Sequence, residues 1–219
     1  NSLMREFHEV LEKDPVNTER VKRKLPAANI VLCRGAGTVP IVSPLQDRFG
    51  IKPACVAAVS LIRGVSKVVG MELVDVKGAT GTPQTDYMAK AKAAARALKT
   101  HDFILLHVKA TDVASHDGNA KLKIEVIEKV DKMLGYLLDN VDIESTYIAV
   151  TADHTTSLRT RNHEGDPVPL AIVGPEVRRD DVTEFNERTC AKGGLHRIRG
   201  MDLMSILMSL IGKTKKFGS

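Results

Sequence analysis

Tryptophan is absent from this sequence of 219 residues, and the aromatic residues are only five phenylalanines and three tyrosines. Single-stranded nucleic acid is bound by stacking its bases on exposed aromatic side chains, so this chain has little to offer such a ligand. The core must be built mainly from Val, Ile, Leu, Ala and Met. Hydrophobic residues make up 43% and charged residues 27% of the sequence, a globular composition that excludes a disordered tail or a fibrous repeat.

Cysteines and long apolar runs are also scarce. Cys33, Cys55 and Cys190 are an odd number without C-x-x-C spacing, which is typical of small buried residues in a reducing compartment. No uninterrupted apolar run approaches the roughly 20 residues that span a bilayer. Residues 1–14 are polar and amphipathic and do not form a signal peptide. We therefore expect a cytoplasmic protein with no membrane partner.

The net charge is modest, since 32 Lys and Arg residues exceed 27 Asp and Glu residues by five. Apart from Lys213, Lys215 and Lys216, the basic residues are interspersed with acidic ones, so we expect no nucleic-acid partner. Two interpretations remain for the excess: a solvated mixed surface, or a site for small anionic molecules.

Apolar and amphipathic segments alternate along the chain. Helices are predicted over residues 2–12, 54–69, 86–99, 120–139 and 201–211, and strands over residues 29–33, 71–76, 103–108, 146–151 and 168–173. This alternation predicts an α/β fold in three layers, with a mostly parallel sheet and helices on both of its faces. Residues 77–85 form the best candidate for a domain boundary.

Three polar segments adjoin these strands. HVKATDVASHDGN places Asp112 and His116 just beyond one strand, TADHTT places Asp153 and His154 just beyond another, and NHEGDPVP places His163 in a loop before a third. Ligands of open α/β sheets collect at the carboxyl ends of strands, so these segments are expected to converge.

Carboxylate and imidazole together suit Zn²⁺ or Mn²⁺. Asp112, His116 and His163 can complete one site. Asp153 and His154 point in opposite directions if extended, so they can serve a second ion or bridge two. Two ions about 3.5–4 Å apart clamp the attacking and leaving oxygens of a phosphoryl displacement. For any one histidine the alternative is a hydrogen-bonded pair with a carboxylate, but three segments together favour metal ligation.

The sequence signals for anion binding are less specific than those for metal ligation. The loop RGAG at 34–37 can cradle a phosphate or be a plain turn. Arg34 strengthens the first interpretation, because a guanidinium binds phosphate or carboxylate through two hydrogen bonds. Arg63 and Lys109 are further candidates, each with a solvated surface charge as the alternative.

Taken in order, the segments resemble a known family. They are PAANIVLCRGAG, IKPACVAAVSLIRGVSKVVGM, HVKATDVASHDGN, TADHTT, NHEGDPVP and GGLHRIRGMDLMSILMSLIGKTKKFGS, and they cover nearly the whole chain. Together they are similar to the archaeal-type cofactor-independent phosphoglycerate mutases of the alkaline phosphatase superfamily. The DxxxH, ADH and downstream histidine are shared across that superfamily, whereas RGAG and the KFG ending are more specific to the mutases.

The resemblance implies a fold of the alkaline-phosphatase type with part of a smaller inserted α/β domain. Residues 1–80 would be the remainder of an inserted substrate-binding domain. Residues 81–219 would be the C-terminal, metal-binding half of the phosphatase-like domain. The chain, which does not begin with Met, would then lack an N-terminal segment of its parent.

The resemblance also implies an activity. Such enzymes are isomerases that interconvert 3-phosphoglycerate and 2-phosphoglycerate in glycolysis and gluconeogenesis, through a phosphoserine and without 2,3-bisphosphoglycerate. They use two divalent ions, often Mn²⁺, with Zn²⁺, Mg²⁺ or Co²⁺ as alternatives. By motif position, one ion would be held by Asp112, His116 and His163, the other by Asp153 and His154. The substrate would contact Arg34, Arg63 and Lys109.

Three departures from the family pattern matter. The nucleophilic serine and a shared aspartate are expected in the missing N-terminal segment, and the resemblance does not make Ser115 the nucleophile. Arg63 stands where lysine is expected, and His196 where glycine is usual. Rival interpretations are a phosphatase, phosphopentomutase or phosphodiesterase of the same superfamily, or a non-catalytic metal-binding fragment.

We predict that the 219-residue chain alone binds divalent metal weakly and does not turn over, because the nucleophile is expected upstream. An assay coupled to enolase in the presence of Mn²⁺ measures this, and ordinary mutase rates would contradict it. Testing phosphoglycerates against p-nitrophenyl phosphate and pentose phosphates separates the rival enzymes.

Overall fold

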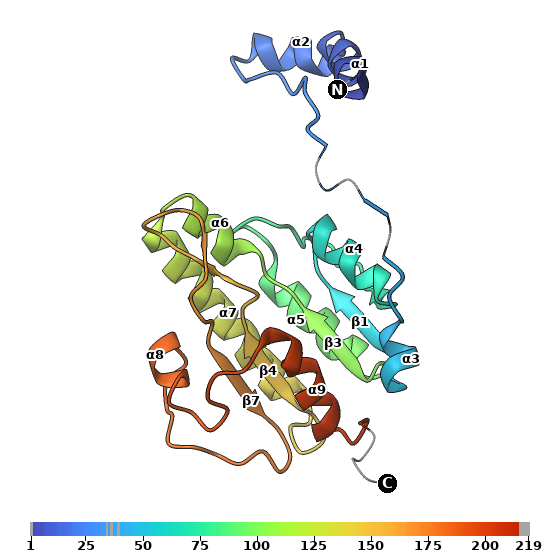
Figure 1. The fold of residues 1–219 in the computed structure, drawn as a ribbon. Coiled ribbons are helices and arrows are strands. Elements are labelled where there is room, and N and C mark those ends of the chain that lie inside the picture. Colours follow the sequence, from blue (N-terminus) through green and yellow to red (C-terminus); the bar gives the residue numbers. More distant parts are fainter. Residues whose placement is uncertain (1, 34, 36, 39, 215–219) are drawn as a thin grey trace. The chain divides into compact units, whose positions relative to one another are not determined.

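The computed structural model describes residues 2–33, 35, 37–38 and 40–214 (Figure 1). The chain divides into two compact units, Asn1–Ile41 and Val42–Ser219.

The first unit consists of two helices and an irregular segment. The predicted helix over 2–12 is confirmed as α1 (Ser2–Glu12), and α2 (Pro15–Lys22) follows it. Asp14 caps α2 by accepting a hydrogen bond from the backbone N–H of Val16 at 2.8 Å. The strand predicted over 29–33 is wrong: this segment is irregular and mostly exposed, and no described strand of the unit lies beside it to complete a backbone ladder.

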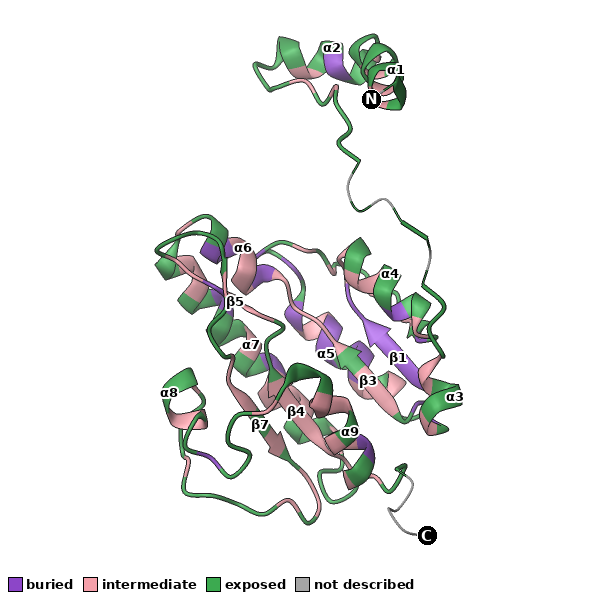
Figure 2. Cartoon of the chain, viewed as in Figure 1, coloured by how far each residue is buried: buried purple, intermediate pink, exposed green. Residues whose placement is uncertain are grey.

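A parallel sheet begins the second unit. β1 (Pro53–Val56) lies between β2 (Glu72–Leu73) and β3 (Phe103–Leu106), and both pairings are parallel. The helix predicted over 54–69 is therefore wrong in its first part, since only α4 (Ser60–Val68) is helical. All of β1 is buried (Figure 2), and a short run that is apolar on both faces cannot be told from a buried helix by periodicity.

Helices cover both faces of this sheet. Successive residues of a strand point to opposite faces. Cys55 belongs to a cluster with Ile62 of α4, whereas Val56 packs with Ala93 and Ala94 of α5 (Tyr87–Ala97). The three-layer α/β arrangement expected from the sequence is thus present here.

The helices predicted over 86–99 and 120–139 are present, and they build the largest part of the core among the described residues. α5 and α7 (Ala120–Asn140) pack together around Ala91, Val126 and Met133. Each helix begins at a side-chain cap, supplied by Asp86 and Asn119. Between them α6 (Ala110–His116) follows β3 and packs on α7.

The remaining strands form two separate antiparallel pairs beside this parallel sheet. β4 (Ile148–Thr151) pairs with β7 (Leu170–Val173), within the segments predicted as strands. β5 (Thr155–Thr156) pairs with β6 (His163–Glu164), a short hairpin that the sequence analysis did not predict. The other helices are α3 (Leu45–Phe49), α8 (Glu187–Cys190) and α9 (Gly200–Leu210), the last of which was predicted.

The division after Ile41 does not coincide with the boundary expected near residue 80. Pro53–Val56 pairs with Phe103–Leu106, so one sheet contains strands from both sides of that position. The assignment of residues 1–80 to a substrate domain and 81–219 to a phosphatase-like domain stays a prediction.

The cysteines are all free, but only Cys55 is buried; Cys33 is exposed, contrary to expectation, and Cys190 is intermediate.

Within the described ranges, no helix combines the length and apolar character needed to cross a membrane.

Lys90 is the largest side chain that the core encloses among the described residues. It is 1% exposed, and its ammonium donates a hydrogen bond to the backbone carbonyl of His107 at 3.1 Å. Burial lowers the pKa of Lys90, because a low-dielectric environment disfavours the charged form. The folded chain therefore binds this proton less tightly than the unfolded chain does.

We predict that Lys90→Met changes how stability depends on pH. A lysine with a lowered native pKa destabilises the fold at neutral pH, and this penalty disappears as pH rises toward the unfolded pKa of about 10.4. The increase in the free energy of unfolding caused by Lys90→Met should therefore be larger at pH 7 than at pH 10. Urea unfolding at both pH values measures it, with exposed Lys92→Met as the control. A pH-independent difference would contradict the prediction.

Candidate metal centre

The carboxylate of Asp112 lies in the first turn of α6, just beyond the carboxyl end of β3, and its side chain is 12% exposed. Its Oδ2 pairs with the ammonium of Lys109, and its Oδ1 accepts a hydrogen bond from Thr156 Oγ1 at 2.5 Å. Burial raises the pKa of Asp112, but hydrogen bonds from Lys109 and Thr156 and the lysine charge outweigh it and lower the pKa to about 2. The group is therefore an ionised acceptor at neutral pH.

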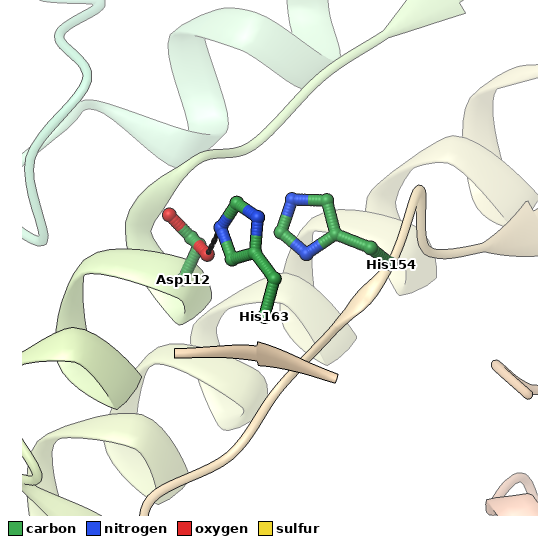
Figure 3. Close-up of side chains that lie close together, drawn as sticks. All are labelled: Asp112, His154 and His163. Carbon is green, nitrogen blue, oxygen red and sulfur yellow. Dashed lines mark ion pairs between the residues drawn. The ribbon is translucent and has the colours of Figure 1, made fainter. Parts of the chain in front are cut away.

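Two histidines face the same carboxylate oxygen. His116 lies one turn further along α6, and His163 begins β6. Their Nε2 atoms lie 3.4 and 3.5 Å from Asp112 Oδ1 and 3.3 Å from each other. Figure 3 shows the ring of His163 facing the carboxylate. The structure thus brings together the three residues predicted to complete one site.

The contact made by the other ring nitrogen of His116, Nδ1, determines which nitrogen can bind a metal ion. Nδ1 lies 2.7 Å from the backbone carbonyl of Arg161, and a carbonyl can only accept, so Nδ1 carries the hydrogen. In the neutral ring the lone pair is then on Nε2, the atom that faces the cluster. Ligating histidines commonly bond a carbonyl or carboxylate through their second nitrogen in this way.

The donor set fits a divalent cation. A carboxylate oxygen and two imidazole nitrogens converge, and electron pairs so close together require a proton or a cation between them. The histidine side chains are 41% and 54% exposed, so the cluster is open to solvent and an ion can enter.

Asp153 and His154 do not point in opposite directions, as an extended strand would require. The backbone bends at both residues, and His154 Nε2 lies 3.5 Å from Asp153 Oδ2. The His154 ring stacks on His163 with 3.8 Å between centroids. Asp112, His154 and His163 each offer a ligand atom within 4.8 Å of the others (Figure 3). Asp153, with its side chain 63% exposed, lies beside this group.

The residues predicted to bind substrate have different surroundings. Arg63 donates a hydrogen bond to Asp75 Oδ1 at 2.7 Å and lines a cleft of about 350 Å³ with Ala57 and Lys77. Lys109 is paired with Asp112. The described residues do not include Arg34.

Thr156 was missed by the sequence analysis. It is 6% exposed and contacts both Asp112 and His154. The only signal was its place in TADHTT, two residues after the histidine. Ser115 is wholly buried and donates a hydrogen bond to the carbonyl of Thr111 at 3.0 Å, so its hydroxyl is engaged within α6.

Comparisons with known proteins place the chain among metalloenzymes. The sequence profile of the Metalloenzyme superfamily matches residues 10–210, and the chain belongs to this superfamily. Within it, the chain is similar to proteins named 2,3-bisphosphoglycerate-independent phosphoglycerate mutase. One from Methanocaldococcus jannaschii is 48% identical over all 219 residues, which are 53% of that protein. One from Pyrococcus abyssi is 48% identical over 217 residues, 99% of this chain and 53% of that protein.

Two solved structures share the fold. The PH0037 protein from Pyrococcus horikoshii is 49% identical, with a TM-score of 0.90 over 97% of this chain and 56% of that one. The cofactor-independent phosphoglycerate mutase from Thermoplasma acidophilum is 32% identical, with a TM-score of 0.63 over 96% of this chain and 50% of that one. The resemblance expected from the sequence is confirmed, and the chain spans about half the length of the curated relatives it matches.

We predict that His116→Ala weakens Mn²⁺ binding by more than about 100-fold, because losing a ligand costs more than the 10–100-fold typical of outer-shell partners. Titration calorimetry on the folded chain measures the affinity. His8→Ala, which changes an exposed histidine of the first unit, is the control. Equal affinities for all three proteins would show that His116 is no ligand.

Proposed function

We propose that this chain carries the metal-binding part of a cofactor-independent phosphoglycerate mutase, which interconverts 3-phosphoglycerate and 2-phosphoglycerate through a phosphoserine. One observation carries the proposal: Asp112 Oδ1, His116 Nε2 and His163 Nε2 lie within 3.5 Å of one another. The similarity to proteins with this name, at 48% identity over the whole chain, supports the same conclusion.

Two divalent ions are proposed, with Mn²⁺ expected and Zn²⁺, Mg²⁺ or Co²⁺ as alternatives. Asp112, His116 and His163 would hold one ion, and Asp153 and His154 would contribute to the other. When bound, such ions supply positive charge at the attacking and leaving oxygens of phosphoryl transfer. Stacking of His154 on His163 supports two adjacent sites.

The chain's own residues prepare this centre. Lys109 occupies Oδ2 of Asp112 and so leaves Oδ1 to face the histidines. The carbonyl of Arg161 holds His116 with its Nε2 toward the cluster. These two contacts orient one carboxylate oxygen and one imidazole nitrogen toward the position proposed for the ion.

The cleft beside Arg63 is proposed to bind the substrate's anionic groups. Arg63, Lys77 and Asp75 line it, so its basic residues exceed its acidic one, and β1 and β3 end at the same edge of the sheet because they are parallel. Arg63 uses one hydrogen bond on Asp75 and one on the carbonyl of Ala57, and a guanidinium has five N–H donors. Lys109 and Arg34 remain proposed substrate contacts on the resemblance.

The serine that accepts the phosphoryl group is not assigned to this chain. Ser115 is the serine nearest in sequence to the ligands Asp112 and His116, but its buried hydroxyl is bonded to Thr111. A place in glycolysis and gluconeogenesis, in the cytoplasm, belongs to the same proposal.

A chimera tests the function. The matching part of the M. jannaschii relative, over which this chain is 48% identical, is replaced by this chain. We predict that the chimera converts 3-phosphoglycerate in an enolase-coupled assay. Asp153→Ala should lower its kcat by about 1,000-fold, because the charge stabilisation of a metal is worth several kcal/mol.

Asp131→Ala, which removes an exposed carboxylate of α7, is the matched control. Full activity of Asp153→Ala would favour a non-catalytic fragment. A folded chimera that prefers p-nitrophenyl phosphate or pentose phosphates would favour another enzyme of the superfamily.

A further inference from the structure

The hydroxyl of Thr156 touches ligands of both proposed ion sites. Its Oγ1 lies 2.5 Å from Asp112 Oδ1 and 3.2 Å from His154 Nδ1. The residue is 6% exposed, so water competes little for these bonds. Thr156 is therefore placed between a ligand of the first site and a ligand of the second.

The backbone around Thr156 is held from two directions. In the β5–β6 hairpin it pairs with His163, so a third ligand lies opposite it in the ladder. From α7, the ammonium of Lys123 donates a hydrogen bond to the carbonyl of Thr156 at 3.3 Å. These contacts hold the backbone from which the hydroxyl projects, and they connect it to α7 of the largest helix–helix core.

The hydrogen bonds of this hydroxyl can run in only one direction. An ionised carboxylate accepts and never donates, so the single hydroxyl hydrogen is directed to Asp112 Oδ1. Thr156 Oγ1 can then only accept from His154. Nδ1 of His154 must carry a hydrogen, which in a neutral ring leaves the lone pair on Nε2, the nitrogen 3.5 Å from Asp153 Oδ2.

We propose that Thr156 is a positioning residue that holds His154 in its Nδ1–H form and orients Oδ1 of Asp112, so that one hydroxyl prepares both ion sites. The inference rests on the proposed metal centre. It parallels the contact by which the carbonyl of Arg161 directs Nε2 of His116. The hydroxyl differs from a carbonyl because it both accepts and donates, so the two sites share one chain of hydrogen bonds.

Substitutions that remove only a hydroxyl test this role. Thr156→Val keeps the shape of the side chain and should weaken Mn²⁺ binding by about 10–100-fold, the usual effect of losing an outer-shell partner. Thr156→Ser restores a hydroxyl and should recover most of the affinity. Thr155→Val is the matched control on the neighbouring residue of the same strand, because the Thr155 hydroxyl bonds the carbonyl of Asp166. Mn²⁺ titrations followed by electron paramagnetic resonance measure all four proteins.

A spectroscopic signature separates positioning from general stability. Imidazole ¹⁵N chemical shifts of the metal-free chain report which nitrogen of His154 carries the hydrogen. The Nδ1–H form is expected in the unchanged chain, in Thr156→Ser and in Thr155→Val, and its loss is expected in Thr156→Val. If circular dichroism shows that Thr156→Val is unfolded, the ¹⁵N spectra of the unchanged chain and of Thr156→Ser still test whether Nδ1 of His154 carries the hydrogen.

The outcomes distinguish the two proposals. An Nε2–H form of His154 in the unchanged chain, or equal Mn²⁺ affinity of folded Thr156→Val, overturns the role of Thr156 and leaves the metal centre standing. An unchanged chain that binds no Mn²⁺ overturns the metal centre itself, and with it the inference drawn from it.

Discussion

The ionised carboxylate of Asp112 is the group on which the arrangement of the centre depends. Removing such a charge from water costs several kcal/mol unless other charges and hydrogen bonds replace the lost hydration. Lys109 pairs with Oδ2, and Thr156 donates a hydrogen bond to Oδ1. Oδ1 also faces the two histidines His116 and His163. A carboxylate held in this way has a defined direction, and its Oδ1 faces the two histidines proposed as ligands.

Two pieces of the fold bring the partners of this carboxylate together. α6 carries Lys109 at its N-cap and Asp112 and His116 within it, and α6 is fixed by packing on α7. The β5–β6 hairpin carries Thr156 and His163 opposite each other. Because the hairpin has only two residues in each strand, its own ladder contributes little, and its contacts with α6 and α7 hold it in position.

Sequence reasoning succeeded where a pattern was long or chemically specific. The helices α5 and α7 were predicted nearly to their ends, the first from its many Ala and Lys residues and the second from its stripe of apolar residues. It failed at Pro53–Val56, where burial on both faces removes the alternation that marks a strand. It also failed at Thr155–Thr156 and His163–Glu164, strands too short to carry a period. The antiparallel pairing of β4 with β7 has no local signal, because parallel and antiparallel strands share one periodicity.

The sequence by itself determined the kinds of ligand and the family resemblance, because residue types and their order along the chain are its direct content. Only the tertiary structure decided which atoms meet. Asp112 and Thr156 are 44 positions apart, and His116 and His163 are 47 apart. Whether their atoms come within hydrogen-bond distance depends on the packing of α6 against α7 and on the bend at Asp153 and His154. The positions of these segments at strand ends predicted that they converge, but the atom-to-atom contacts join residues that are remote in sequence, and no local pattern encodes those.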